Sequence, residues 1–518
     1  MKLIRILSDR IQMRTDEEEF SGLRIQDLIT VTDGTVELIA CVTSLADRDS
    51  ETEVLGEEDY VGAAGSVKMI ECSIIGSIKN GRYVKAVDRY PTTDIEARGM
   101  KKEEFAAMLQ VDTEECFPIG QYVDYGCTAL VNGNKLFQRH SCIVGNTGCG
   151  KSETVAKILE EVSKLPGANI VLFDIHGEYS RLSYVDNLHI GPEFSFPVWM
   201  FGFSDMVANI LKIKEETSTV AMAALRKCYM EECDGNESKP VYFDYDRLLN
   251  GLKFLNAEVI GTGEVYKTGD RAGEPKTVKG DYNGKLSGVI HVLEAKRADK
   301  RYSFLFGNEK QEYLYEVVDR LLGGDKPVKN IDLSDVPHDV AIPLIGVITK
   351  LVYDIQRSMA PAMRPVMLVC DEAHVYIPNH MQLTASERRM VEIFENIAKE
   401  GRKFGTTLFV ASQRPSELNK TILAQCANFI VSKLNNETDK SMIKAMLPEG
   451  NESVVESTVM FSPGDILIVG DAVPVSMKIH VDLARERPQS RTVAFWDEWK
   501  KAFRFVDYSG IVDEFLED

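Results

Sequence analysis

The chain has 518 residues, 44% of them apolar and 27% charged, which is typical of folded globular proteins rather than of disordered chains. Its 60 Lys and Arg residues against 80 Asp and Glu residues give a formal net charge of -20. This charge excludes a protein whose whole surface binds nucleic acid, so any DNA contact must be confined to a local basic region. The ten cysteines form no C-x-x-C pair and no apolar stretch is long enough to span a bilayer, so we expect a cytoplasmic protein with reduced thiols and no membrane segment.

Residues 1–120 are predicted to form a small β-barrel. Two runs rich in Val, Ile and Thr flank the dipeptide Asp33-Gly34, and a similar arrangement returns around Asn80-Gly81. Both dipeptides are typical of the tight turns of β-hairpins. Several short strands joined in this way favour a small barrel or sandwich.

After residue 120 the pattern changes to short apolar runs that alternate with helical stretches. Such runs are typical of buried parallel strands, so residues 121–204 and 358–480 are predicted to form the two parts of a covered α/β sheet. Residues 205–357 separate these parts and are predicted to be a mainly helical insertion. The predicted strands are "SCIVG" from Ser141, "NIVLFD" from Asn169, "VMLVCDE" from Val366, "TTLFVAS" from Thr406, "NFIVSK" from Asn428 and "DILIVG" from Asp465.

The first predicted strand of the core leads directly into "GNTGCGKS", which a helical stretch follows. The motif fits G-x-x-x-x-G-K-[ST], whose glycines let backbone N–H groups surround phosphate oxygens. Lys151 is predicted to reach the β- and γ-phosphates and Ser152 to bind Mg²⁺, so ATP and Mg²⁺ are the predicted cofactors. The predicted nucleotide-binding residues of this loop are Gly145, Asn146, Thr147, Gly148, Cys149, Gly150, Lys151 and Ser152.

Polar residues follow two later strands of the core. "VMLVCDEAH" ends in two adjacent acids, of which Asp371 is predicted to hold Mg²⁺ and Glu372 to polarise the attacking water. Gln413 follows "TTLFVAS", and its amide can donate to a γ-phosphate oxygen and accept from the water. The alternative for Gln413 is that Ser-Gln-Arg-Pro only closes the strand.

Two adjacent cations stand in "EGRKFG", between an amphipathic helical stretch and the Gln413 strand. Phosphoryl transfer leaves charge on the γ-phosphate oxygens, and an inserted guanidinium neutralises it. Arg402 is predicted to be such a catalytic arginine, directed toward a neighbouring subunit. The alternative is that Arg402 and Lys403 cap the negative C-terminal end of the preceding helix.

Three more charged residues each have two interpretations. Asp174 and Glu178, in "LFDIHGEYS", either approach the nucleotide or belong to a plain glycine-containing turn. Arg139 precedes the first core strand and either contacts a phosphate of an adjacent site or is a surface charge. Glu178 and Arg139 are therefore retained as candidate nucleotide-binding residues.

Taken together, these motifs resemble the HerA branch of the FtsK/HerA family of ring-forming DNA translocases. The resemblance rests on "GNTGCGKS", "FDIHGEYS", "VCDEAHVYIP" and "NIAKEGRKFGTTLFVASQRPSELNKTIL". It implies a RecA-like P-loop core, a small N-terminal β-barrel and a helical insertion. It also implies a homohexamer that binds ATP between neighbours, with Arg402 acting in trans, double-stranded DNA in the central channel, and residues 481–518 bracing a neighbouring subunit.

The same resemblance implies a partner enzyme on the β-barrel face. This partner would be a nuclease similar to NurA or an effector of antiviral defence, such as a sirtuin-type NADase or a nuclease. The predicted function is therefore an ATP-hydrolysing translocase or helicase on double-stranded DNA that acts with such a partner. The alternative is a nucleotide-gated hexameric scaffold that assembles and activates the partner with little DNA unwinding. A motor's ATPase should respond to duplex DNA, and a scaffold's to its partner.

Overall fold

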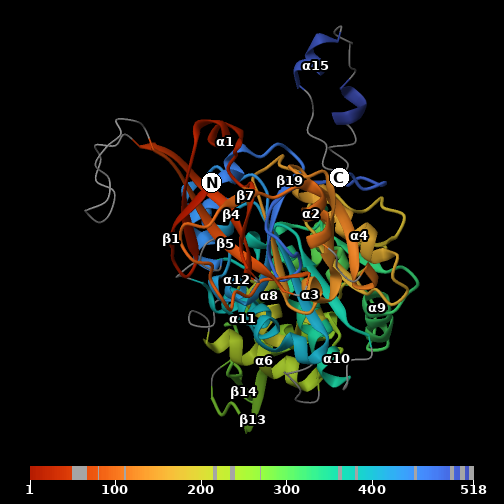
Figure 1. Ribbon diagram of the computed structural model, residues 1–518. Helices are drawn as coiled ribbons and strands as arrows, with labels where there is room; N and C mark the ends of the chain where they lie inside the picture. Colours follow the sequence, from red (N-terminus) through yellow and green to blue (C-terminus); the bar gives the residue numbers. More distant parts are fainter. Residues whose placement is uncertain are drawn as a thin grey trace.

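A computed structural model describes residues 1–34, 36–48, 67–79, 81–109, 113–213, 219–233, 240–268, 270–359, 364–379, 383–447, 452–489, 495–501 and 508–512. Figure 1 shows an N-terminal sheet in red and orange, a central sheet flanked by helices, and the yellow and green helices of the insertion at the end opposite to α15 (Phe495–Lys500). Among the described residues, no helix is both long and apolar enough to cross a membrane.

The N-terminal part is a 7-stranded antiparallel sheet. Its strand order is β1 (Lys2–Ile6), β2 (Arg10–Thr15), β5 (Val67–Lys79), β4 (Val36–Arg48), β3 (Leu28–Asp33) and β7 (Ala97–Gly99), with β6 (Arg82–Val84) paired to β5. The hairpin predicted at Asp33-Gly34 is confirmed, because β3 and β4 pair on either side of it and Gly34 has a φ of 58°. The strands β5 and β6 pair around the second predicted turn, although Asn80 itself lies outside the described residues.

The two ends of this sheet approach each other. An isolated antiparallel bridge joins Lys2 of β1 to Glu96, directly before β7. Two backbone hydrogen bonds extend it, from Leu3 N to Ile95 O at 3.0 Å and from Ala97 N to Met1 O at 2.9 Å. The bridge covers part of both edge strands, which otherwise present unpaired backbone groups.

The central sheet has 11 strands and carries the nucleotide motifs. Its strand order is β12 (Val185–His189), β15 (Val328–Asp332), β11 (Ile170–Asp174), β16 (Val366–Cys370), β17 (Thr406–Ser412), β10 (His140–Val144), β18 (Cys426–Val431), β19 (Asp465–Gly470), β20 (Lys478–Val481), β8 (Cys116–Tyr122) and β9 (Cys127–Asn132). From β12 to β18 the strands are parallel, which confirms the prediction for five of the apolar runs. The sixth run, β19, is antiparallel to β18, so that part of the prediction was wrong. Burial on both faces gives a strand the same apolar pattern in either direction.

Helices cover both faces of the central sheet. In β11, Val171 and Phe173 join a core with the insertion helices, whereas Ile170 and Leu172 join a second core with α4. Helices of the core are α4 (Lys151–Ser163), α10 (His338–Ser358), α11 (Ala385–Glu400), α12 (Lys420–Gln425), α13 (Glu437–Met446) and α14 (Glu452–Ser457). Shorter helices are α1 (Glu17–Gly22), α2 (Lys102–Met108) and α3 (Gly133–Phe137), the last of which lies against β9 and β10.

The described residues of the range 205–357 are mainly helical, and they also contribute β15 to the central sheet. Since β8 begins before residue 120, we propose that the insertion ends near residue 326 and that the core begins near residue 116. An exposed two-stranded hairpin projects from the insertion in Figure 1. The elements of this region are α5 (Gly202–Asp205), α6 (Thr219–Glu232), α7 (Tyr245–Ala257), β13 (Val259–Val265), β14 (Pro275–Lys279), α8 (Ser287–Ala298) and α9 (Tyr313–Leu322).

His140, the first residue of β10, joins this strand to its neighbours. Its Nδ1 accepts a hydrogen bond from Leu408 N at 2.9 Å, so its Nε2 donates to Ala398 O, also at 2.9 Å. Burial lowers the pKa of His140, because the charged imidazolium loses its hydration and could no longer accept from Leu408.

We expect this buried histidine to make the protein sensitive to acid. Because its folded-state pKa lies below the unfolded value of about 6.5, the unfolded chain takes up the proton first, and stability falls as the pH drops below that value. Chemical denaturation of wild type and His140→Asn at pH 7.5 and pH 5.5 should show a smaller loss in the variant. An equal loss in both proteins would contradict the prediction.

Candidate nucleotide site

The loop "GNTGCGKS" lies between β10 and α4, at the carboxyl edge of the parallel strands. Gly148 and Gly150 have φ values of 76° and 95°, and a Cβ on Gly145 would lie 2.6 Å from the Cys149 sulfur, so glycine is required at these turns. The loop is tied to the neighbouring strand segment, because Asn146 N donates to Lys433 O at 2.9 Å. Its N–H groups and the start of α4 form a concave surface suited to phosphate oxygens.

The predicted catalytic side chains, which follow the three strands β10, β16 and β17, meet at this loop. Lys151 Nζ lies 2.5 Å from Glu372 Oε1, and both side chains are nearly buried, with 6% and 7% exposed. Gln413 Nε2 donates to the same Glu372 oxygen at 2.5 Å, and Thr147 Oγ1 donates to Gln413 Oε1. The structure thus brings together four residues from three motifs that the sequence selected separately.

Glu372 is held in a strained position. Its φ of 45° lies in the left-handed region, which non-glycine residues rarely adopt outside functional sites. Burial alone would raise the pKa of Glu372, but the Lys151 ammonium and the hydrogen bonds from Lys151 and Gln413 outweigh it, so the pKa lies below its usual value. Glu372 is therefore an ionised carboxylate, the form that accepts a proton from water.

His374 is a neighbour of Glu372 to which sequence reasoning gave no role. Its Nδ1 lies 3.3 Å from Glu372 Oε2 and 3.3 Å from Ser412 Oγ. Burial lowers its pKa, which favours a neutral ring. The residue stands in the string "DEAH", but only the fold shows that it contacts the end of β17.

The other predicted acid, Asp371, has surroundings that fit a divalent cation. Its Oδ1 is buried without a hydrogen-bond partner, and burial raises the pKa of Asp371 to about 7. The charge of Glu178, whose Oε2 is also buried without a partner, adds to this shift. Mg²⁺ prefers such oxygen ligands and would remove the cost of burying their charge. No described group of three His, Cys, Asp or Glu side chains could hold a metal alone, so phosphate oxygens and Ser152 would have to complete the shell.

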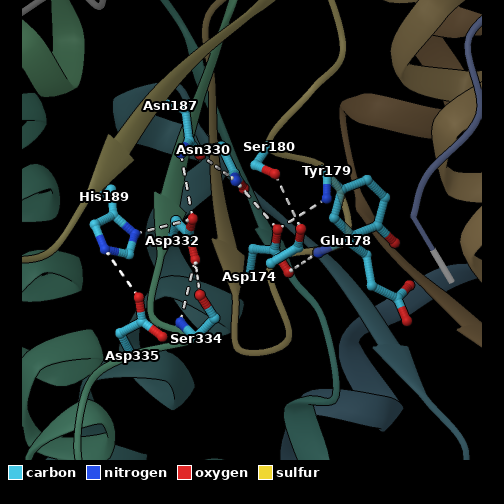
Figure 2. A network of polar contacts seen from close by, with 11 residues as sticks. Asp174, Glu178, Tyr179, Ser180, Asn187, His189, Asn330, Asp332, Ser334 and Asp335 are labelled. Carbon is cyan, nitrogen blue, oxygen red and sulfur yellow. Dashed lines mark hydrogen bonds and ion pairs between the residues drawn. The ribbon is translucent and has the colours of Figure 1, made fainter. Parts of the chain in front are cut away.

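The turn that carries Glu178 is fixed by two adjacent strands. Asp174, at the end of β11, accepts hydrogen bonds from Glu178 N at 3.0 Å and Tyr179 N at 2.9 Å. A Cβ on Gly177, whose φ is 69°, would lie 3.2 Å from Ser334 Oγ, so glycine is needed there. Figure 2 shows Asp174 in this turn and the Glu178 side chain pointing away from Asp332. The motif is therefore a glycine-containing turn, and the role of Glu178 at the nucleotide stays a prediction.

A second network in Figure 2 supports this turn from β15. Asp332 Oδ1 accepts from Ser334 Oγ at 2.7 Å, and Asp332 Oδ2 lies 3.1 Å from His189 Nδ1. Asn330 Nδ2 donates to Asp174 Oδ2 at 3.1 Å. Burial raises the pKa of Asp332, but these hydrogen bonds outweigh it, and the pKa is lowered overall. Through Asn330, this network on β15 fixes the side chain of Asp174 and thereby supports the turn that carries Glu178.

The two candidate arginines lie at the opposite edge of the sheet from the phosphate loop. Arg402 stands in the turn Gly401–Phe404, before the first residue of β17, and Arg139 precedes the parallel strand β10. With 7 residues at about 3.3 Å each, the ends of β17 lie ~20 Å apart. Neither arginine can therefore reach the phosphate loop of its own chain.

The surroundings of both arginines are open. Arg402 borders a cavity of about 740 Å³ that Gln138 and Thr406 also line. Arg139 is 58% exposed and lies 3.8 Å from Asp471, a weak surface pair. The alternative in which Arg402 and Lys403 cap α11 remains compatible with their place directly after that helix.

Comparison with known proteins finds relatives that are described as helicases. The family model described as the central domain of helicase HerA matches residues 117–352. A probable helicase of Methanocaldococcus jannaschii is 26% identical, and the alignment covers 72% of this chain and 68% of the relative. The DNA double-strand break repair helicase HerA of Saccharolobus solfataricus is 25% identical, over 79% of this chain and 77% of the relative. The solved structure of VirB4 of Thermoanaerobacter pseudethanolicus aligns with 73% of this chain and 98% of its own, at 16% identity and a TM-score of 0.48.

Proposed function

We propose that this chain, which belongs to the HerA family, is an ATPase that uses hydrolysis to move along double-stranded DNA as a homohexamer. The observation that carries the proposal is the position of Arg402. The phosphate loop and this arginine occupy opposite edges of one sheet, so a complete site needs the loop of one subunit and the arginine of the next. Such a heterologous contact closes into a ring when the rotation between subunits permits it, and we propose a ring here.

The contacts of Lys151, Glu372 and Gln413 support an order of events for ATP binding and hydrolysis. In the structure, Glu372 is engaged by Lys151 and Gln413. The γ-phosphate of ATP attracts Lys151, which leaves the Glu372 carboxylate available to accept a proton from water. Gln413 then bridges between a γ-phosphate oxygen and this water, since its amide both donates and accepts. Mg²⁺, held by Ser152 and Asp371, would neutralise phosphate charge when bound.

Hydrolysis would be completed from the neighbouring subunit. Arg402 supplies positive charge to the γ-phosphate of the adjacent site, where charge develops during transfer. Arg139 stands at the start of the neighbouring strand on the same edge and is proposed to contact the same polyphosphate. Glu178 is proposed to contact the nucleotide from the same subunit as the phosphate loop.

The N-terminal sheet is proposed to be a small β-barrel that docks a partner enzyme. The bridge between Lys2 and Glu96 supports closure of the sheet. Ile4, Leu7, Ile25 and Tyr90 expose 43%, 37%, 45% and 42% of their surface in this region, which favours an apolar contact. A nuclease similar to NurA or an antiviral effector is the class of partner that the family resemblance suggests.

Two further regions are proposed to act in the ring. Residues 481–518 are proposed to brace a neighbouring subunit, and the described residues 495–501 among them carry the exposed Trp496 and Trp499. The projecting hairpin of β13 and β14 carries Lys276 and Lys279, and six copies would gather such cations around one channel. All ten cysteines lie among the described residues and none is in a disulfide; a reducing, cytoplasmic location is proposed.

A direct test measures ATP turnover and native mass with and without duplex DNA. We expect a hexamer whose ATPase rises severalfold with duplex DNA, and whose stimulation falls as salt rises because phosphate contacts release counterions. Lys151→Ala should remove the activity, and Lys164→Ala, at the exposed end of the same helix, should retain it. A monomer with full activity at every dilution would contradict the ring. Stimulation by the partner protein alone would favour the scaffold.

A further inference from the structure

The residues that follow the last core strand cross the helix of the phosphate loop. This segment, residues 482–489, is called the strap. Arg485 N donates to Glu160 Oε2 of α4 at 2.6 Å, and Glu486 Oε2 accepts from Ser183 N at 2.5 Å. At the end of the strap, Gln489 N donates to Glu178 O at 2.7 Å. The strap is thus bonded to α4 and to the Glu178 turn.

Arg487 is the strap residue nearest to the phosphate loop in these contacts. Its Nε lies 3.8 Å from Glu153 Oε1, in the first turn of α4 and directly after Ser152. The Glu153 side chain is 27% exposed, and its Oε2 is buried without a hydrogen-bond partner. The second oxygen of Glu153 therefore lacks any described neutralising contact.

A carboxylate at this position opposes nucleotide binding. The start of α4 attracts anions through its free N–H groups, but a negative side chain beside Ser152 repels the triphosphate that the loop must hold. A guanidinium beside that carboxylate cancels its charge, and the hydrogen bonds of Arg485 and Gln489 hold the strap in place for it.

We propose that Arg487 is a positioning residue for nucleotide binding, which neutralises Glu153 so that the phosphate loop can accept Mg-ATP. This inference rests on the nucleotide site proposed above and adds the C-terminal strap to it. Arg487 acts on affinity rather than on the chemical step, because it faces the start of α4 and not Glu372. The site is then built from one subunit's loop, its own strap and the arginine of a neighbour.

Four full-length variants, compared with wild type, test this inference, with the dissociation constant of Mg-ATPγS and the turnover of ATP as readouts. Arg487→Ala should weaken binding about fivefold, near the upper end for a partly exposed ion pair, and leave turnover at saturating ATP unchanged. Glu153→Gln should bind at least as tightly as wild type. The double variant should return to within about twofold of wild type, since the repulsive charge is gone. Arg485→Ala is the matched control, because its contact uses the backbone N–H.

The rescue separates charge cancellation from a structural role. If Arg487 only held the strap in place, Glu153→Gln would not restore affinity in the double variant. The effect should also shrink at high salt, because screening weakens repulsion at a partly exposed site. Unchanged affinity in Arg487→Ala, or no rescue, would overturn the inference. If wild type itself failed to bind Mg-ATPγS, the proposed function would fail first.

Discussion

Replacing Glu372 by Gln is expected to lower ATP turnover by about two to three orders of magnitude while Mg-ATP still binds. The amide keeps an oxygen for Lys151 and Gln413, whose contacts with Glu372 are both 2.5 Å, so the site keeps its shape. It cannot accept a proton from water, and the general base is lost. Turnover is measured by phosphate release, and binding by titration with a fluorescent ATP analogue.

The control for this variant is Glu392→Gln, an equivalent change on the exposed face of α11. It should leave both readouts within about twofold of wild type, as surface substitutions usually do. Turnover above one tenth of wild type in Glu372→Gln would show that another group activates the water. His374, 3.3 Å from Glu372 Oε2, would then be the next residue to replace.

Replacing Arg402 by Ala is expected to reduce turnover about a thousandfold with nucleotide still bound, because the γ-phosphate loses its transition-state cation. Lys403→Ala is a matched control in the same exposed turn, and it should stay near wild type. Equal losses in both variants would favour the alternative in which the two cations serve the end of α11. Wild-type turnover in Arg402→Ala would contradict the assignment of the catalytic arginine.

Mixing two inactive variants tests whether Arg402 acts between subunits. Lys151→Ala subunits lack a working phosphate loop but keep Arg402, and Arg402→Ala subunits have the reverse defect. In mixed rings, some interfaces combine an intact loop with an intact arginine, so activity should reappear on mixing. Because ~20 Å of strand separates the two elements within one chain, rescue is the outcome that the sheet geometry predicts. Mixtures that stay inactive would contradict action in trans.

The sequence predicted those parts of the fold whose signal is local. Six apolar runs all became strands of the central sheet, because burial on both faces leaves an uninterrupted apolar pattern. Strand β15 was missed, since Lys329, Asn330 and Asp332 make it appear polar. In the fold Lys329 Nζ donates to Asn169 Oδ1 at 3.0 Å, and burial lowers its pKa to about 8. Polar side chains with buried partners hide a core strand from pattern analysis.

The residues of the candidate site also divide into those with a local sequence signal and those whose contacts only the fold shows. The phosphate loop and the pair Asp371 and Glu372 were predicted because each is a contiguous motif after an apolar strand. The contact from Thr147 to Gln413 joins residues 266 positions apart, and no spacing rule predicts it. The approach of Arg487 to Glu153 likewise depends on where the chain returns after β20. Long-range pairs of this kind require the fold.

Strand β10 has a mechanical consequence for the proposed ring. At one end it continues into the phosphate loop, and at the other His140 is hydrogen-bonded to Ala398 of α11, the helix that leads into Arg402. Because β10 has only 5 residues and is hydrogen-bonded on both sides, it would transmit a displacement between the phosphate loop and the end of α11. Binding or release of nucleotide in one site would then shift the Arg402 side chain that the next site receives, and hydrolysis would follow a sequential order around the proposed ring.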